Sequence, residues 1–283
     1  EDIKMLQLRV CSILNTLLID NRECVNVVIE TGIIDEVLSI INMIPLSQVL
    51  IVHLSPLHEF FEICSSQQKL LFVDKGIIHT MRYLLDSHDE LCVKIAVGII
   101  ERIIHASQEQ SRQGVQIDIK KIIASGGTLD KLVAVLSNDE YQDQEINQNA
   151  SLAIGQVFKA SPIPKEFRNK VILTIKKMTN NEDVYIRSVS IDVLSGLAEC
   201  QDNHSDILSC NYPATIVRFI SQKNNIIVHY TLQLIHNILT HGLPQTVGMS
   251  ILLFPSRPFE ELSKHSDPFI AENAKAIISI LKK

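Results

Sequence analysis

The chain has 283 residues, of which 46% are hydrophobic and 20% charged, so it has enough apolar material for a large core and too little charge for a disordered chain. Its formal net charge is −6, and it lacks the basic excess typical of nucleic-acid-binding proteins. We therefore predict no nucleic-acid partner. It contains only 10 Gly and 9 Pro, fewer than a turn-rich β-protein needs. The low content of both argues against a turn-rich β-protein.

Targeting signals and cysteine motifs are missing from the sequence. No apolar stretch reaches the roughly 18 to 20 uncharged residues of a membrane span, and the first residues lack a signal-peptide pattern. The six cysteines form no CxxC pair and lie mostly in apolar runs, so we expect free thiols in a reducing compartment, the cytoplasm or also the nucleus. We predict no metal or other cofactor.

The first predicted element is a long helix over residues 1–20, because its apolar residues follow three-four spacing. The chain begins inside this amphipathic segment, as expected of a fragment of a longer protein. We expect its apolar side to make end-to-end contact with missing repeats or with another subunit. The apolar residues are Ile3, Leu6, Val10, Ile13, Leu14 and Leu17.

Short amphipathic helices follow Gly32, Gly76 and Gly127. Glycine at such a junction permits a positive φ and a close helix crossing. A polar turn then precedes the next helix, and in residues 86–89 its Asp and Ser can cap that helix.

Longer helices are predicted over residues 91–105, 146–159, 184–199 and 226–241. Each has apolar residues on two flanks and one narrow polar strip, so each is expected to be buried on both sides and wet along that strip. Two polar insertions, residues 108–116 and 138–145, lengthen the spacing between elements. Residues 108–114 and 138–144 lack apolar side chains apart from Tyr141, and we predict that both segments are mobile.

The long helices recur with a period near 42 residues, which is typical of stacked helical repeats. The stretch from Gly76 to Ile100, with its Gly-Ile-Ile start, its Leu-Leu-Asp-Ser turn and the alanine at position 96, resembles the armadillo repeat. HEAT repeats, with two helices per unit, are the alternative. The resemblance implies an all-α, right-handed superhelical armadillo-type solenoid of about six to seven repeats over residues 1–283. The approximate repeats are 1–20 (partial), 21–66, 67–106, 117–160, 164–200, 205–242 and 243–283.

The resemblance implies a noncatalytic domain that binds a partner protein or peptide in a concave groove lined by the third helices. Phosphate-binding glycine loops and nucleophile elbows are both missing from the sequence, so no enzyme activity is expected. The chain has no Trp, which speaks against the importin-alpha type of groove. The candidate groove residues are His58, Glu62, Glu101, Arg102, Gln156, Asp192, Gln233 and Asn237.

Two other functions fit the same pattern. An armadillo-type regulatory protein or chaperone cofactor would clasp its partner over a large surface. A structural component of a cytoskeletal or ciliary assembly would use convex faces and ends.

Overall fold

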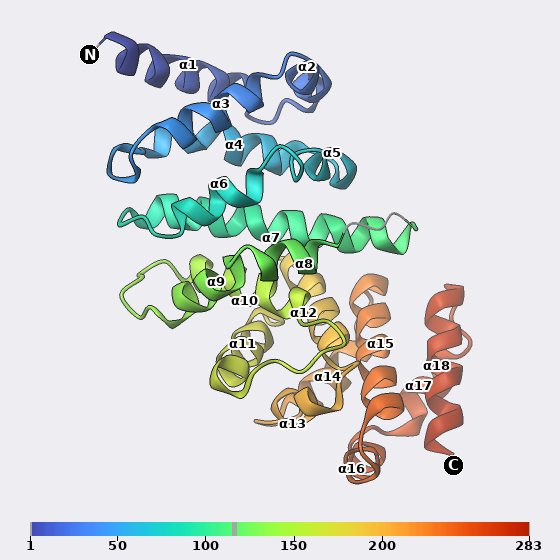
Figure 1. The fold of residues 1–283 in the computed structure, drawn as a ribbon. Helices are drawn as coiled ribbons and strands as arrows, with labels where there is room; N and C mark the ends of the chain where they lie inside the picture. Colours follow the sequence, from blue (N-terminus) through green and yellow to red (C-terminus); the bar gives the residue numbers. More distant parts are fainter. Residues whose placement is uncertain (1, 115–117, 283) are drawn as a thin grey trace. The chain divides into compact units, whose positions relative to one another are not determined.

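The computed structural model describes residues 2–114 and 118–282, and this part of the chain holds α-helices, short 3-10 helices and turns but no β-strand. The predicted all-α class is confirmed. Contacts between residues divide the chain into two compact units, residues 1–153 and 154–283 (Figure 1). The division falls inside helix α10, Gln144–Val157.

Unit 1 consists of successive helices joined by short turns. Each chain segment between two long helices carries two shorter ones, so the order after α1 is short, short, long. The elements are α1 (Asp2–Leu18), η1 (Arg22–Cys24), α2 (Val25–Glu30), α3 (Ile33–Met43), η2 (Leu46–Gln48), α4 (Ile51–Ile63), α5 (Ser66–Leu70), α6 (Ile77–Leu84), α7 (Glu90–Arg112), α8 (Ile119–Ser125), α9 (Thr128–Ser137) and the first part of α10.

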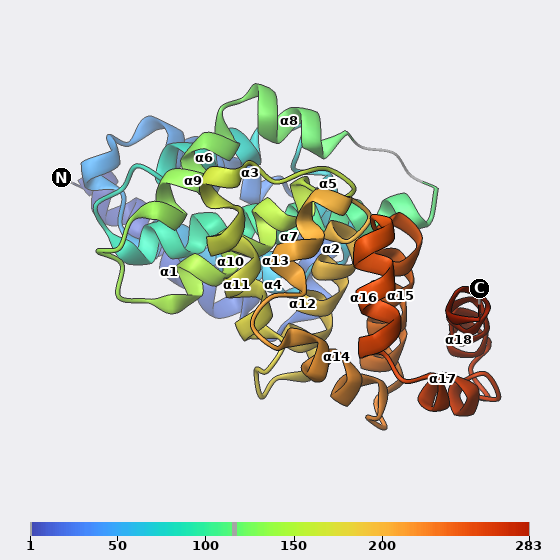
Figure 2. The ribbon, with the colours of Figure 1, turned by 90° about the horizontal axis from the view of Figure 1, so that it is seen from below.

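The helices of unit 1 form two layers. In one layer α1 packs against α4 and α4 against α7; in the other α3 packs against α6 and α6 against α9 (Figure 1). Figure 2 shows α3, α6 and α9 gathered on one side of α1 and α4. Phe60, Phe61 and Phe72 form an edge-to-face cluster in the core, with ring centroids 5.3 to 5.9 Å apart. This arrangement makes α1, α4, α7 and α10 the third helices of the repeats in this unit.

Left-handed backbone at the start of the second helices confirms the role predicted for glycine. Gly32, Gly76 and Gly127 immediately precede α3, α6 and α9, with φ of 69°, 85° and 71°. In unit 2 Asn211 takes the equivalent place before α14 with φ of 58°. A positive φ is accessible to Gly and, among other residues, best tolerated by Asn and Asp.

Unit 2 continues the order with one exception. Here α11 packs on α12, α12 on α15 and α15 on α18, so that α12, α15 and α18 are its third helices. The elements are α11 (Lys165–Met178), α12 (Val184–Leu197), η3 (Gln201–Asn203), α13 (His204–Ile207), α14 (Tyr212–Ile220), α15 (Asn225–His241), α16 (Pro244–Leu253), α17 (Ser256–Leu262) and α18 (Pro268–Leu281).

The exception is α11, one continuous helix where the other repeats have two short ones. The segment from residue 156 to residue 195 contains no glycine, so the left-handed junction that separates the two short helices elsewhere is missing. The repeat made of α11 and α12 therefore has the two-helix order of a HEAT repeat, while the neighbouring repeats have three helices each.

The first polar insertion is folded differently from the prediction. Helix α7 continues to Arg112, so residues 108–112 are helical. Ser66 on α5 donates a hydrogen bond to Glu109 in this part of α7. Gln, Glu, Ser and Arg in this stretch are compatible with helix, which lets α7 run on beyond its buried part. Residues 115 and 116 of the predicted insertion lie outside the described residues. In the second insertion, the backbone N–H of Asp143 donates to Glu90 over 2.6 Å, which ties the end of that loop to α7.

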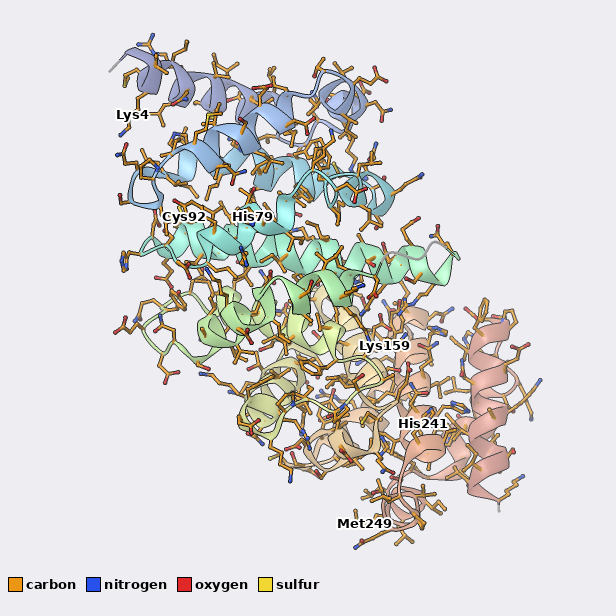
Figure 3. All side chains as sticks on the ribbon, in the orientation of Figure 1. Lys4, His79, Cys92, Lys159, His241 and Met249 are labelled. Atoms are coloured by element: carbon orange, nitrogen blue, oxygen red, sulfur yellow. The ribbon has the colours of Figure 1, made fainter. Side chains whose placement is uncertain are left out.

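Asp and Asn caps at the helix starts fit the predicted turns. Asp89 accepts a hydrogen bond from the Leu91 amide at the start of α7. Asp183 and Asn224 likewise accept from backbone amides in the first turns of α12 and α15. Among the described residues, one side of α1 and a stretch of α16 that includes Met249, labelled in Figure 3, expose large apolar side chains.

Candidate functional site

A pocket of about 240 Å³ opens among the third helices of unit 1. We call it the α4–α7 pocket. Its lining comes from α1, α4, α7 and α10, so four successive third helices meet at one site. The lining residues are Asn15, Ile51, Ser55, His58, Glu59, Leu91, Lys94, Ile95, Gly98, Arg102, Glu145 and Asn149.

Helical spacing explains why these residues share the site. On α7, each of Leu91, Lys94, Ile95, Gly98 and Arg102 lies three or four residues from another of the set, so they lie along one face. The same spacing on α4 joins residues 51, 55, 58 and 59. The packing of α1 on α4 and of α4 on α7 then brings these faces together. The pocket is therefore built by repeat stacking, and no single helix could form it.

Gly98 gives the pocket its floor. A Cβ atom at this position would lie 2.7 Å from Nη1 of Arg102 and 3.5 Å from Nδ2 of Asn149. The Arg102 guanidinium thus lies over the glycine, and its Nη2 forms an ion pair with Glu62 on α4. The structure brings together three of the predicted groove residues here, because Nε2 of His58 is also 4.0 Å from Oε1 of Glu62.

Lys94 is held by two carboxylates at the other side of the pocket. Its Nζ lies 2.6 Å from Glu145 and 2.9 Å from Asp143. The hydrogen bond to Glu145, together with that to Asp143, raises the pKa of Lys94, and the hydrogen bond from Lys94 lowers the pKa of Asp143. Both cations of the pocket are therefore already neutralised by residues of this chain.

The remaining polar groups of the lining include atoms without a partner. Burial lowers the pKa of His58, and the nearby Arg102 charge lowers it further, which favours the neutral imidazole. Within the part of the chain that the structure describes, the buried atoms Nδ1 of His58 and Oδ1 of Asn15 have no hydrogen-bond partner. Over the same residues, Glu59 makes no hydrogen bond or ion pair. The site thus keeps acceptors, the Glu59 carboxylate and Oδ1 of Asn15, that no donor of the described residues uses.

The predicted groove residues of unit 2 differ in burial and in the hydrogen bonds they make. Asn237 on α15 donates from Nδ2 to the Ser195 carbonyl over 2.9 Å and to Ser195 Oγ over 3.2 Å, so it links α15 to α12. Gln233 is half-buried one turn earlier on α15. The exposure expected from the polar strips is wrong at two positions: Gln156 is only 2% exposed and Asp192 only 9%. Packing covers their strips, and three-four spacing does not reveal this.

Most of the lining, including Asn15, Lys94 and Asn149, is not among the groove residues predicted from the sequence. The sequence did contain one signal for them. Lys94 lies on the same polar strip of α7 as Arg102, and Asn15 and Asn149 are polar positions on the neighbouring third helices α1 and α10. Glu101 lies next to Arg102 and is half-buried, but it does not line the α4–α7 pocket.

Over residues 2–114 and 118–282, no group of three or more His, Cys, Asp or Glu side chains is placed to hold a metal ion, and no helix combines the length and apolar character needed to cross a membrane. The six cysteines are free.

Comparisons with known proteins give the fold. No protein-family model matches the sequence, and no curated protein sequence matches it. Among solved structures, a designed armadillo repeat protein covers 87% of this chain and 99% of its own length at 17% identity and a TM-score of 0.62. The match to an engineered protein covers 95% of this chain and 63% of the engineered protein, at 15% identity and a TM-score of 0.65.

A second designed armadillo repeat protein, solved in complex with the peptide (KR)4, covers 87% of this chain and 98% of its own length at 18% identity and a TM-score of 0.56. Such identities establish likeness of fold alone. The chain therefore has the all-helical armadillo-type repeat fold.

Proposed function

We propose that this chain is a noncatalytic interaction domain that binds a segment of a partner polypeptide along its third helices, with the α4–α7 pocket as the anchor point. The observation that carries this proposal is the pocket itself. It is large enough for a side chain, it lies where four third helices meet, and its walls combine apolar and polar groups, as binding sites do. Rigid stacked repeats keep such a surface preformed, so binding orders little of the domain.

The designed armadillo repeat protein in complex with (KR)4 supports a peptide as the kind of ligand. The groove residues Glu62, Arg102 and Asn237 would contribute mainly by holding the third helices in place, because their polar atoms already bond within this chain. His58 and Gln233 are half-buried and remain candidates for direct contact. Gln156 and Asp192 are candidates only as support, because they are buried.

The test uses a library of random displayed peptides selected on the intact chain. Gly98→Leu is the blocking variant, because its side chain would occupy the space above the glycine and displace the mobile end of Arg102. We expect selected peptides to lose binding to Gly98→Leu and to crosslink to third helices of unit 1. Circular dichroism of the variant checks its folding. Peptides that bind the variant equally well and crosslink to α3, α6 or α9 would refute the proposal.

Association through an end of the repeat stack is a second candidate function. On α1, Ile3, Leu6, Ile13 and Leu17 are each more than half exposed and follow helical spacing. A partner covering this face would use apolar burial in place of groove contacts. Sedimentation of the wild type and of Leu6→Lys with Ile13→Lys tests it: self-association that the double variant abolishes supports this function, and a concentration-independent monomer argues against self-association.

A further inference from the structure

The charge distribution of the α4–α7 pocket identifies the chemistry of its occupant. The cations Lys94 and Arg102 are surrounded by four carboxylates, those of Glu59, Glu62, Asp143 and Glu145. Three of the four are committed to the two cations. With His58 neutral, the four carboxylates exceed the two cations by two negative charges: one is shared by Asp143 and Glu145 around Lys94, and the other is on Glu59, which pairs with neither cation.

Glu59 is the group that lacks a counter-charge. It is half-buried on α4, and among the described residues no cation pairs with it. A partly buried carboxylate is more stable when a positive group approaches it, because the interaction strengthens as water is excluded. An anionic or purely apolar occupant would leave Glu59 without compensation.

The acceptors around Glu59 favour a group with several donors. Asn15 and Asn149 present amide groups from α1 and α10, and the Ser55 hydroxyl uses its proton on the Ile51 carbonyl at 2.9 Å, which leaves its lone pairs as acceptors. A guanidinium carries five donors in a fixed planar fork, whereas an ammonium is a compact point charge. Ile51 and Ile95 in the same walls offer apolar contact to the aliphatic part of an arginine side chain.

Building on the proposed function, we propose that the partner segment places one arginine side chain in the α4–α7 pocket, with its guanidinium at Glu59 and its methylene groups against Ile51 and Ile95. The pocket volume of about 240 Å³ leaves room for such a side chain. Specificity for a cation comes from this chain's own ion pairs, which neutralise Lys94 and Arg102 and leave Glu59 for the partner.

The test follows the δ1-methyl signals of isoleucine by NMR on the intact chain. The probe is the capped peptide Gly-Ser-Arg-Ser-Gly, and its matched control carries citrulline, a neutral analogue of arginine. We expect the arginine peptide to shift the Ile51 and Ile95 methyls and to bind about tenfold more tightly than the citrulline peptide, as a charged hydrogen bond predicts. The buried Ile216 in unit 2 serves as an internal reference.

Two variants connect the effect to the carboxylate. Glu59→Gln should reduce affinity for the arginine peptide to that of the citrulline peptide, whereas Glu36→Gln, an exposed carboxylate on α3, should leave it unchanged. Equal binding of the two peptides, or no change in Glu59→Gln, would overturn the arginine inference. So would the lack of any shift at peptide concentrations up to about 10 mM.

The outcomes also separate this inference from the proposed function. Library-selected peptides that move the Ile51 and Ile95 methyls without any preference for arginine would leave the groove function standing and remove only the arginine. Selected peptides that move methyls exclusively outside the pocket would remove both.

Discussion

Replacing Asn203 with Ala should be among the most damaging single changes in unit 2. The side chain is fully buried at the end of η3 and completes three hydrogen bonds. Its Nδ2 donates to the carbonyls of Ser161 and Leu197, both over 3.0 Å, and its Oδ1 accepts from the Ile163 amide over 3.2 Å. One amide thereby joins the segment before α11 to the end of α12.

The magnitude follows from those bonds. A hydrogen bond contributes about 1 kcal/mol net, and a buried group that loses its partner costs about 1–3 kcal/mol. We therefore expect Asn203→Ala to lower the free energy of unfolding by about 3–4 kcal/mol. Asn203→Asp, which keeps the shape but presents oxygen to two carbonyls, should cost at least as much at neutral pH.

Urea unfolding followed by circular dichroism measures the loss as a change in midpoint at constant m value. Asn273→Ala is the matched control, since that half-buried side chain makes one solvent-exposed bond, to the Phe269 carbonyl at 2.9 Å. We expect it to change the free energy of unfolding by no more than about 0.5 kcal/mol. Hydrogen exchange adds a local reading, because the Ile163 amide should lose protection in Asn203→Ala. A loss below about 1 kcal/mol, or one equal to the control, would refute this reasoning.

Three further predictions concern packing, pH and metals. Gly155→Ala should lower the free energy of unfolding by about 1–2 kcal/mol, because its Cβ would lie 2.6 Å from Val193 and 3.0 Å from Ile175. This steric strain exceeds the gain in helix propensity from Gly to Ala. A rise in the urea midpoint would contradict the prediction. Burial lowers the pKa of His53 and His204 below the ordinary 6.5, so the unfolded chain binds protons more readily and stability should fall as the pH drops below 6.5 toward the folded pKa values. Urea midpoints measured over a series of pH values test this, and midpoints that stay constant through that window would argue against it. Prolonged dialysis against a chelator should leave Tm unchanged, since folding is expected to need no metal; a lowered Tm that added metal restores would reverse that expectation.

Local rules were sufficient to predict much of the fold. Three glycines at equivalent places predicted left-handed junctions, and the spacing of apolar residues predicted the long helices to within a few residues except at the end of α7. The continuous helix α11 also had a signal, the missing glycine, because the junction it would form is a local property of the backbone. The end of α7 had no such signal, since polar helix formers are equally compatible with a loop.

The site was less predictable because its bonds join residues far apart in the sequence. Glu62 and Arg102 are each ordinary polar positions on their own helices, and only stacking of α4 on α7 makes them a pair. Burial of Gln156 likewise depends on what packs over its strip. Asn203 appears in the sequence merely as a polar turn residue, and its three partners lie before α11 and at the end of α12.

The contacts along the third helices change how mutations on this surface must be interpreted. Asn237→Ala removes a donor that binds the Ser195 carbonyl, and Arg102→Ala frees Glu62 beside His58, so either change perturbs the stack before any partner is considered. A loss of binding in these variants would therefore not distinguish a contact from a support. Glu59 avoids this problem, since it makes no internal polar bond among the described residues, whereas a side chain at Gly98 would displace the Arg102 that pairs with Glu62. Partner contacts on this domain are best mapped from positions that the repeats do not already use to hold each other.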